Sequence, residues 1–216
     1  MAAIIGRMFR DRTDAGERLA EALRGRVGPD AVVLGVPRGG VVVAVPVAEA
    51  LGLPLDVVVP RKLRAPFNPE LGIGAVAPGV RYLDDDLVRR LGIDEAYLDR
   101  EVALEQEEVE RRTAAYRGDR PAVDVAGRTV VVVDDGVATG GTAIASIRWA
   151  RKAGAARVIF AAPVGPAGAE ERLGREADEV VLLETPSMFM AVGEWYDRFE
   201  QTTDDEVRAA LAAGPA

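Results

Sequence analysis

The chain has 216 residues, 49% of them hydrophobic, and this length suits one α/β domain with a sizeable core. It contains neither cysteine nor histidine, which excludes disulfides, thiolate nucleophiles, zinc sites of Cys and His, and a Ser-His-Asp triad. The net charge of −8 argues against nucleic-acid binding, and no apolar run approaches the ~20 residues of a membrane helix.

The first half of the chain is predicted to begin a layered fold. Asp14 and Glu17 resemble a capping box at the start of a helix. We expect helix, strand, helix and strand at residues 14–26, 31–36, 41–51 and 55–59, with a turn at Pro37-Arg38-Gly39-Gly40. Pro66, Asn68 and Pro69 favour a loop over 61–71.

The second half alternates between the two kinds of element. A hairpin at 72–76 and 80–83 precedes a charged helix at 94–117. Strands at 129–133, 158–163 and 179–183 alternate with helices at 142–153, 167–175 and 203–212. This alternation predicts an α/β fold with a mostly parallel sheet and helices on both faces.

The segment 129–142 carries the most informative pattern. An apolar strand ends in Asp134 and Asp135, and a turn rich in glycine and threonine then leads into a helix. Ligands bind at the carboxyl ends of such strands, and the backbone N–H groups of the turn and helix start form an anion cradle. Gly140 and Gly141 allow the backbone to come close to a bound anion, and Thr139 and Thr142 add hydroxyl donors.

Two other phosphate motifs do not fit this segment. Gly136 and Gly141 have the spacing of a P-loop, but Thr142 follows without the required lysine, and no Gly-x-Gly-x-x-Gly is present. A carboxylate ~6 Å from a phosphate costs about 3 kcal/mol at an effective dielectric near 20, which disfavours bare phosphate. A sugar phosphate fits better, because the carboxylates can accept ribose hydroxyls or face Mg²⁺. The alternative is an Asp-Asp-Gly turn that merely ends a strand.

The segment resembles the phosphoribosyl-pyrophosphate signature of type I phosphoribosyltransferases: an apolar strand, two acidic residues, a spacer and Thr-Gly-x-Thr. Its form is similar to that of adenine phosphoribosyltransferases, and residues 10–210 resemble stand-alone bacterial phosphoribosyltransferases. The resemblance implies one domain, 1–216, with a small hood formed by 184–216. It also implies that Asp134 and Asp135 meet the ribose and Mg²⁺. The 5′-phosphate would lie on Gly136, Val137, Ala138, Thr139, Gly140, Gly141 and Thr142.

Two further segments resemble parts of the family site. Arg38, Gly39 and Gly40 resemble the pyrophosphate loop, although a turn that requires glycine explains them about as well. Arg61 and Lys62 occupy the place of a basic pair beside the pyrophosphate, where cations stabilise the departing diphosphate. The alternative for this pair is a solvated strand end.

The loop and the tail carry weaker resemblances. Residues 63–74 resemble the mobile catalytic loop, in which Glu70 would donate a proton to the base or be a surface residue. Four of the eleven aromatics lie in 187–199, so Trp195 and Tyr196 either stack on a nucleobase or simply pack the tail. Ala138 and Pro163-Val164-Gly165-Pro166 depart from the oxopurine pattern and disfavour an oxopurine acceptor.

The sequence therefore predicts a transferase that uses Mg²⁺-phosphoribosyl pyrophosphate to ribosylate a nitrogenous base, with release of pyrophosphate. A non-catalytic regulatory protein that binds the sugar pyrophosphate and a sugar-phosphate hydrolase or lyase are the alternatives. Arg38, Arg61 and Lys62 argue against a mere sensor. Met1–Arg12 shows no apolar signal core, so we expect a cytoplasmic protein without membrane partners. Dimers are usual in the family, so the resemblance also implies a homodimer.

Overall fold

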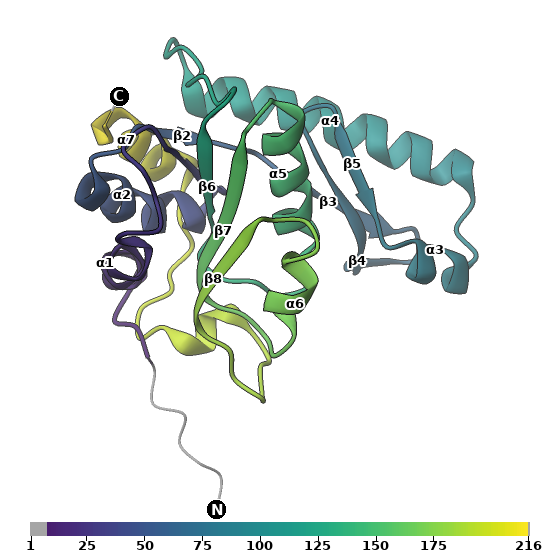
Figure 1. Cartoon of the computed structure of the whole chain (residues 1–216). Coiled ribbons are helices and arrows are strands. Elements are labelled where there is room, and N and C mark those ends of the chain that lie inside the picture. The colour runs from purple at the N-terminus through teal and green to yellow at the C-terminus, as the bar shows by residue number, and fades with distance from the viewer. Residues whose placement is uncertain (1–7, 216) are drawn as a thin grey trace, which may run out of the picture.

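A five-stranded parallel sheet forms the centre of the computed structural model, which describes residues 8–215 (Figure 1). The strand order is β2-β1-β6-β7-β8, and every neighbouring pair is parallel. The strands are β1 (Val32–Gly35), β2 (Leu55–Val57), β6 (Thr129–Val133), β7 (Arg157–Val164) and β8 (Glu179–Glu184). All five lie where the sequence places strands, and the predicted α/β fold is confirmed.

Helices cover both faces of this sheet. One side carries α1 (Arg12–Leu23), α2 (Gly39–Leu51) and α7 (Asp204–Ala213), and the other α5 (Gly141–Lys152) and α6 (Ala169–Leu173). Side chains of β6 alternate between two cores: Val131 and Val133 pack with α1 and α2, while Val130 and Val132 pack with α5. This burial on both faces explains the uninterrupted run of valines.

A smaller antiparallel sheet stands beside α5 (Figure 1). It contains β3 (Arg61–Ala65), β4 (Asn68–Ala77) and β5 (Val80–Leu83), followed by α3 (Asp85–Leu91) and the long helix α4 (Glu95–Arg117). Leu63, Ile73 and Val109 form its core between the sheet and α4. Helix α4 also reaches β2 and α7, so it joins the two sheets.

Three local predictions need correction. Residues 61–71 are not a loop, because β3 and β4 pair as a hairpin whose register shifts beside Arg64 accommodate the irregular sequence. Helix α3 was not predicted. The first helix begins at Arg12, and its N-cap is Asp11, which accepts the N–H of Asp14, so Asp14 and Glu17 form no capping box.

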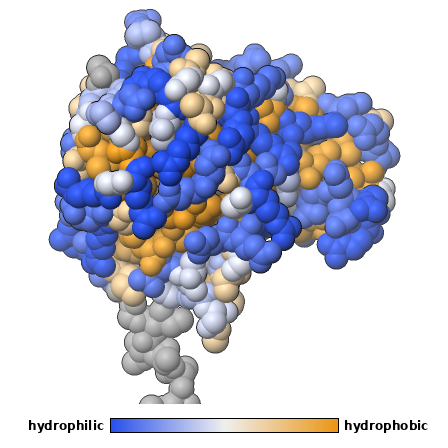
Figure 2. All heavy atoms as spheres, viewed as in Figure 1, coloured by the Kyte–Doolittle hydropathy of each residue, from blue (hydrophilic) through white to orange (hydrophobic). Residues whose placement is uncertain are grey.

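The C-terminal segment returns across the body of the molecule after β8. It contains a short 3-10 helix, η1 (Val192–Trp195), and a bridge that pairs Phe9 with Tyr196. Figure 2 shows polar and charged residues over much of one face, with apolar residues exposed in separate areas. No helix among the described residues is long and apolar enough to cross a membrane. Residues 1–7 lie outside the described range, so the expectation that Met1–Arg12 contains no signal core falls mostly on residues without a described structure.

Candidate active site

The acidic pair stands at the carboxyl end of β6, in the middle of the parallel sheet. The N–H of Asp134 donates to the carbonyl of Ala161 on β7 at 3.2 Å, and the chain then leaves the sheet. The N–H of Asp135 donates to Oδ1 of Asp134 at 2.8 Å. Both carboxylates are thus presented where ligands of parallel sheets bind.

The glycine- and threonine-rich turn lines a cavity of about 320 Å³. Gly140 adopts a left-handed conformation, with φ +78°, and α5 starts at the next residue without a side-chain cap. The first N–H groups of α5 are therefore available to an anion. Lys62 of β3, Tyr82 of β5, Asp84 and Arg172 of α6 are among the other residues that line it. We call this the loop cavity.

A second cavity, of about 390 Å³, lies on the other side of the acidic pair. The turn Pro37–Gly39 lines it together with Arg12 of α1 and with Phe199, Gln201 and Thr202 of the C-terminal segment. Asp134 and Thr142 line both cavities. We call this second space the arginine cavity, because Arg12 and Arg38 both border it.

Two glycines of the Pro37–Gly40 turn are required by close contacts. A Cβ at Gly39 would lie 1.9 Å from Oδ2 of Asp135, and a Cβ at Gly40 would lie 2.7 Å from Cα of Asp134. Real Cβ atoms do not approach other atoms so closely. The turn and the acidic pair therefore pack directly on each other, across a distance of about 95 residues in sequence.

Burial dominates the electrostatics of the acidic pair. It raises the pKa of Asp134 well above the usual value, and the charge of Asp135 raises it further. Burial also raises the pKa of Asp135, although the guanidinium of Arg12 opposes the shift. Two carboxylates held so close resist simultaneous ionisation unless a cation is near.

Comparison with known proteins identifies the family. The family model of the phosphoribosyl transferase domain matches residues 10–198. The chain belongs to the phosphoribosyl transferase domain family. The acidic pair and residues 136–142, which line the loop cavity together with Asp134, lie within the matched region.

Several relatives of this phosphoribosyl transferase domain were found. Two proteins from strains of Mycobacterium tuberculosis, whose names propose a phosphoribosyl transferase, are 48% identical over 206 residues, covering 95% of this chain and 46% of theirs. The chain thus spans about half the length of these relatives. The crystal structure of TT1426 from Thermus thermophilus is 46% identical, with a TM-score of 0.80, and the match covers 94% of this chain and 97% of that one. A ribose-phosphate pyrophosphokinase of Pyrococcus furiosus is 43% identical over 65 residues, 29% of this chain and 23% of that protein.

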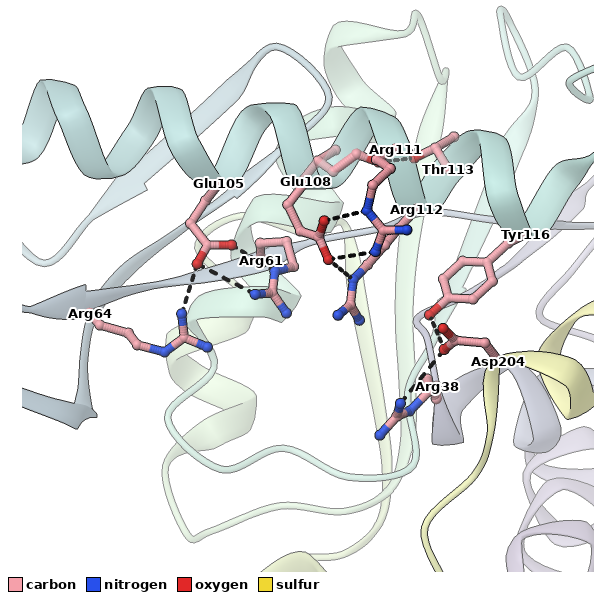
Figure 3. Close-up of polar contacts among 11 residues, drawn as sticks. Arg38, Arg61, Arg64, Glu105, Glu108, Arg111, Arg112, Thr113, Tyr116 and Asp204 are labelled. Carbon is pink, nitrogen blue, oxygen red and sulfur yellow. Dashed lines mark hydrogen bonds and ion pairs between the residues drawn. The ribbon is translucent and has the colours of Figure 1, made fainter.

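The predicted basic pair of this phosphoribosyl transferase domain separates in the structure. Lys62 is exposed and lines the loop cavity, whereas Arg61 donates to the buried Glu105 of α4 at 2.7 Å and 3.4 Å. A register shift after Leu63 places Arg64 on the same carboxylate, at 2.7 Å. Figure 3 shows this arrangement, in which Glu105 binds two arginines beneath α4. Arg61 thus lines neither cavity.

Arg38 remains at the mouth of the arginine cavity. Its guanidinium lies 3.6 Å from Asp204 of α7, which also accepts the hydroxyl of Tyr116 at 2.8 Å (Figure 3). Asp204 is about half exposed, so this ion pair is weak and Arg38 can exchange it for an anionic ligand.

Four other predicted site residues lie outside both cavities: Gly40, Glu70, Trp195 and Tyr196. Glu70 is exposed on β4, where its N–H donates to the side chain of Asn68. Trp195 and Tyr196 are buried in an aromatic cluster with Phe9, so neither presents a free ring face for a base. The hydroxyl of Tyr196 instead donates to the carbonyl of Asp135 at 2.6 Å.

Sequence reasoning missed Arg12, Tyr82 and Arg172. Arg12 lines the arginine cavity, and Arg172 lines the loop cavity while donating to the hydroxyl of Tyr82 at 3.0 Å. Arg172 lies in the charged surface sequence of α6, with glutamates before it and Arg175 after it. Nothing local distinguishes such a residue, since only the fold brings it to the turn.

Proposed function

We propose that this chain is a phosphoribosyltransferase. It uses Mg²⁺-phosphoribosyl pyrophosphate to attach a 5-phosphoribosyl group to a nitrogenous base, with release of pyrophosphate. The observation that carries the proposal is that Asp134 and Thr142 line two cavities at once. An anion cradle lies on one side of the acidic pair and an arginine-bearing turn on the other, which suits a sugar with a phosphate at each end.

Each cavity has a distinct part in this proposal. The loop cavity holds the 5′-phosphate on the N–H groups that begin α5, with Lys62 and Arg172 as nearby cations. The carboxylate of Asp134 accepts the ribose hydroxyls between the cavities. The diphosphate lies along Pro37–Gly40, where Arg38 meets its charge.

The reaction breaks the bond between C1′ and the diphosphate oxygen. C1′ then has oxocarbenium character, and a ring nitrogen of the base attacks it, while the bonding electrons leave with pyrophosphate. Arg38 beside the diphosphate stabilises its growing charge, which is the main contribution that this chain makes to the rate. The attacking nitrogen loses its proton to the departing pyrophosphate or to water, which balances the transfer.

The acidic pair fits a magnesium ion carried by the substrate. Among residues 8–215, no group of three or more acidic, histidine or cysteine side chains could hold a metal ion. Mg²⁺ in such sites is bound through one or two carboxylates, water and substrate phosphates. Asp134 is the carboxylate that would hold it, and the ion would supply positive charge to the diphosphate.

The relatives support these assignments. The family match supports transfer of a phosphoribosyl group, and the local similarity to a ribose-phosphate pyrophosphokinase supports a ribose phosphate ligand. A nucleobase acceptor and a homodimer are proposals that follow from the family resemblance alone, and a cytoplasmic location is proposed as well.

Thermal unfolding with and without ligands tests the proposal. A ligand at ~100 times its Kd adds about 2.7 kcal/mol of stability, or roughly 5–10 °C in Tm for a chain of this size. We expect a Mg²⁺-dependent shift that is larger for phosphoribosyl pyrophosphate than for ribose 5-phosphate or AMP. Absence of a shift at millimolar concentrations would refute the sugar-phosphate site.

Product analysis then separates the remaining activities. A transferase releases pyrophosphate only when a suitable base is added, so a panel of nucleobases identifies the acceptor. Binding without pyrophosphate release for any base would instead favour a regulatory protein. Ribose 5-phosphate formed without a base would indicate a hydrolase.

A further inference from the structure

One carboxylate of the acidic pair is already paired with a cation. Nε of Arg12 donates to Oδ2 of Asp135 at 2.8 Å, and the two side chains are only 12% and 18% exposed. The Arg12 guanidinium also donates to the carbonyl of Glu200 at 2.9 Å and lies 3.9 Å from the ring centroid of Phe199. These three contacts fix the side chain of Arg12, whereas an exposed arginine moves freely.

Asp135 is fixed just as closely. Arg12 binds its carboxylate, the hydroxyl of Tyr196 binds its carbonyl at 2.6 Å, and its N–H donates to Asp134. Asp134 forms no ion pair within residues 8–215 and, unlike Asp135, lines both cavities. The two acidic residues thus have different surroundings although they are adjacent in sequence.

The ion pair rests on the turn that carries Arg38. A Cβ at Gly39 would lie 1.9 Å from Oδ2 of Asp135 and 2.5 Å from Nε of Arg12. Because no side chain fits there, the turn, the ion pair and Asp135 form one packed unit. A shift of the Arg12 side chain would therefore displace both the acidic pair and the turn.

We infer that Arg12 is a positioning residue for the acidic pair: it fixes the Asp135 carboxylate against the Pro37–Gly40 turn and leaves Asp134 to meet the sugar. This inference rests on the proposed function. Its consequence is that an incoming sugar diphosphate meets one uncompensated carboxylate instead of two, with less repulsion. Asp135 is then an anchor for the site and not a ribose ligand.

A direct role for Arg12 is the competing explanation, because Arg12 borders the arginine cavity together with Arg38. The two roles differ in their dependence on Asp135. A positioning residue loses its effect when the Asp135 charge is removed, whereas a residue that contacts the diphosphate keeps its effect. Double-mutant cycles measure this difference.

The test is the Kd of Mg²⁺-phosphoribosyl pyrophosphate, measured by calorimetry for the wild type, Arg12→Gln, Asp135→Asn and the double variant. We expect Arg12→Gln to raise the Kd at least tenfold in the wild-type background and less than threefold in the Asp135→Asn background. Arg12→Lys keeps the charge and should restore most of the affinity. It also provides the comparison in both backgrounds if Arg12→Gln does not fold.

Arg24→Gln is the matched control, because Arg24 forms an exposed pair with Glu21 at 2.9 Å at the end of the same helix. Its Kd should equal that of the wild type. An equal loss on replacing Arg12 in both backgrounds, or no loss in either, would overturn the inference while the proposed function stands. A wild type that does not bind the ligand would overturn both.

Discussion

At the residue scale, the site depends on side chains from outside the glycine- and threonine-rich turn. Gly136 to Thr142 supply backbone N–H groups, but the cations that border the loop cavity are Lys62 and Arg172, from β3 and α6. A phosphate held by neutral donors alone binds more weakly than one that also meets a cation. Arg172 is therefore expected to add affinity at the 5′-phosphate.

Replacing Arg172 tests that expectation. Charge-assisted hydrogen bonds contribute about 1.5–3 kcal/mol, so Arg172→Ala should weaken ribose 5-phosphate binding by about 10- to 100-fold. Arg175→Ala is the control, since Arg175 is three-quarters exposed, pairs with Glu171 and does not line the loop cavity. Equal affinities of the two variants, measured by calorimetry, would remove Arg172 from the phosphate site.

The acidic pair predicts a defined dependence of stability on pH. Burial raises the pKa of both carboxyls above the usual 3.8, so each binds its proton more tightly in the folded chain than in the unfolded one. Their contribution to the free energy of unfolding is complete below pH 3.8 and is lost as the pH rises through the raised values. The double variant Asp134→Asn with Asp135→Asn removes this dependence.

Urea unfolding of the wild type and the double variant between pH 4 and 8 measures the effect. We expect the stability of the wild type, relative to the variant, to fall as the pH rises. The variant should remain folded but no longer bind ribose 5-phosphate or its pyrophosphate. Wild-type affinity in the double variant would contradict the placement of the sugar on this pair.

At the element scale, the sequence predicts the parallel sheet better than the small sheet. The strand at 129–133 and the helix that follows are marked by an apolar run, by carboxylates and by glycines, and the structure places both within one residue of the expectation. The hairpin of β3 and β4 has no such mark. Pro66, Asn68 and Pro69 indicate a loop, but packing of Leu63 and Ile73 against α4 stabilises strands there.

Helix α4 holds that hairpin through a buried carboxylate. Glu105, whose side chain is 5% exposed, binds both Arg61 and Arg64, and the hydroxyl of Tyr97 donates to the carbonyl of Arg64 at 2.8 Å. The pattern on α4 predicts a solvated helix with one packing face. It does not predict which glutamate is buried, because that depends on residues about 40 positions earlier.

Removing this carboxylate should destabilise the small sheet. Glu105→Ala leaves two partly buried guanidinium groups without their common partner, and we expect a loss of about 2–4 kcal/mol in the free energy of unfolding. Glu107→Ala, at an exposed position on the same helix, should change stability by less than about 0.5 kcal/mol. Equal urea midpoints for the two variants would show that Glu105 does not hold the hairpin.

At the scale of the whole molecule, an early and a late segment of the described residues meet the middle of the chain. Phe9 and Arg12 come from the N-terminal part, Tyr196 and Phe199 from the C-terminal segment, and all four surround Asp135 or its partners. The sequence indicates an aromatic tail but leaves open whether Trp195 and Tyr196 stack on a base or pack the tail, and in the structure they pack it. Side chains that are buried together by distant segments leave no periodic pattern, so their position could not be predicted.

The hydroxyl of Tyr196 offers the clearest test of this long-range arrangement. Tyr196→Phe keeps the ring, which packs 5.4 Å from Phe9 and 4.9 Å from Phe199 between centroids, but leaves the carbonyl of Asp135 without its donor. We expect a loss of about 1–2 kcal/mol, or roughly 2–8 °C in Tm. Tyr196→Leu also removes the ring contacts and should cost more, about 3 kcal/mol or above.

The pH dependence of that loss distinguishes the hydroxyl from general repacking. Burial, and then the charge of Asp135, raise the pKa of Tyr196 far above its ordinary value, so the hydroxyl stays protonated throughout the neutral and mildly alkaline range. The stability difference between the wild type and Tyr196→Phe should therefore be constant up to about pH 9. It should shrink as the pH rises above 10.0, where the hydroxyl ionises in the unfolded chain but not in the folded one. A difference that stays constant above pH 10 would mean that the hydroxyl ionises as readily in the folded chain as in the unfolded one, and that Tyr196 is not enclosed. A difference that shrinks above pH 10, accompanied by weaker binding of the sugar diphosphate to Tyr196→Phe, would show that the C-terminal segment positions Asp135 from a distance of 61 residues in sequence.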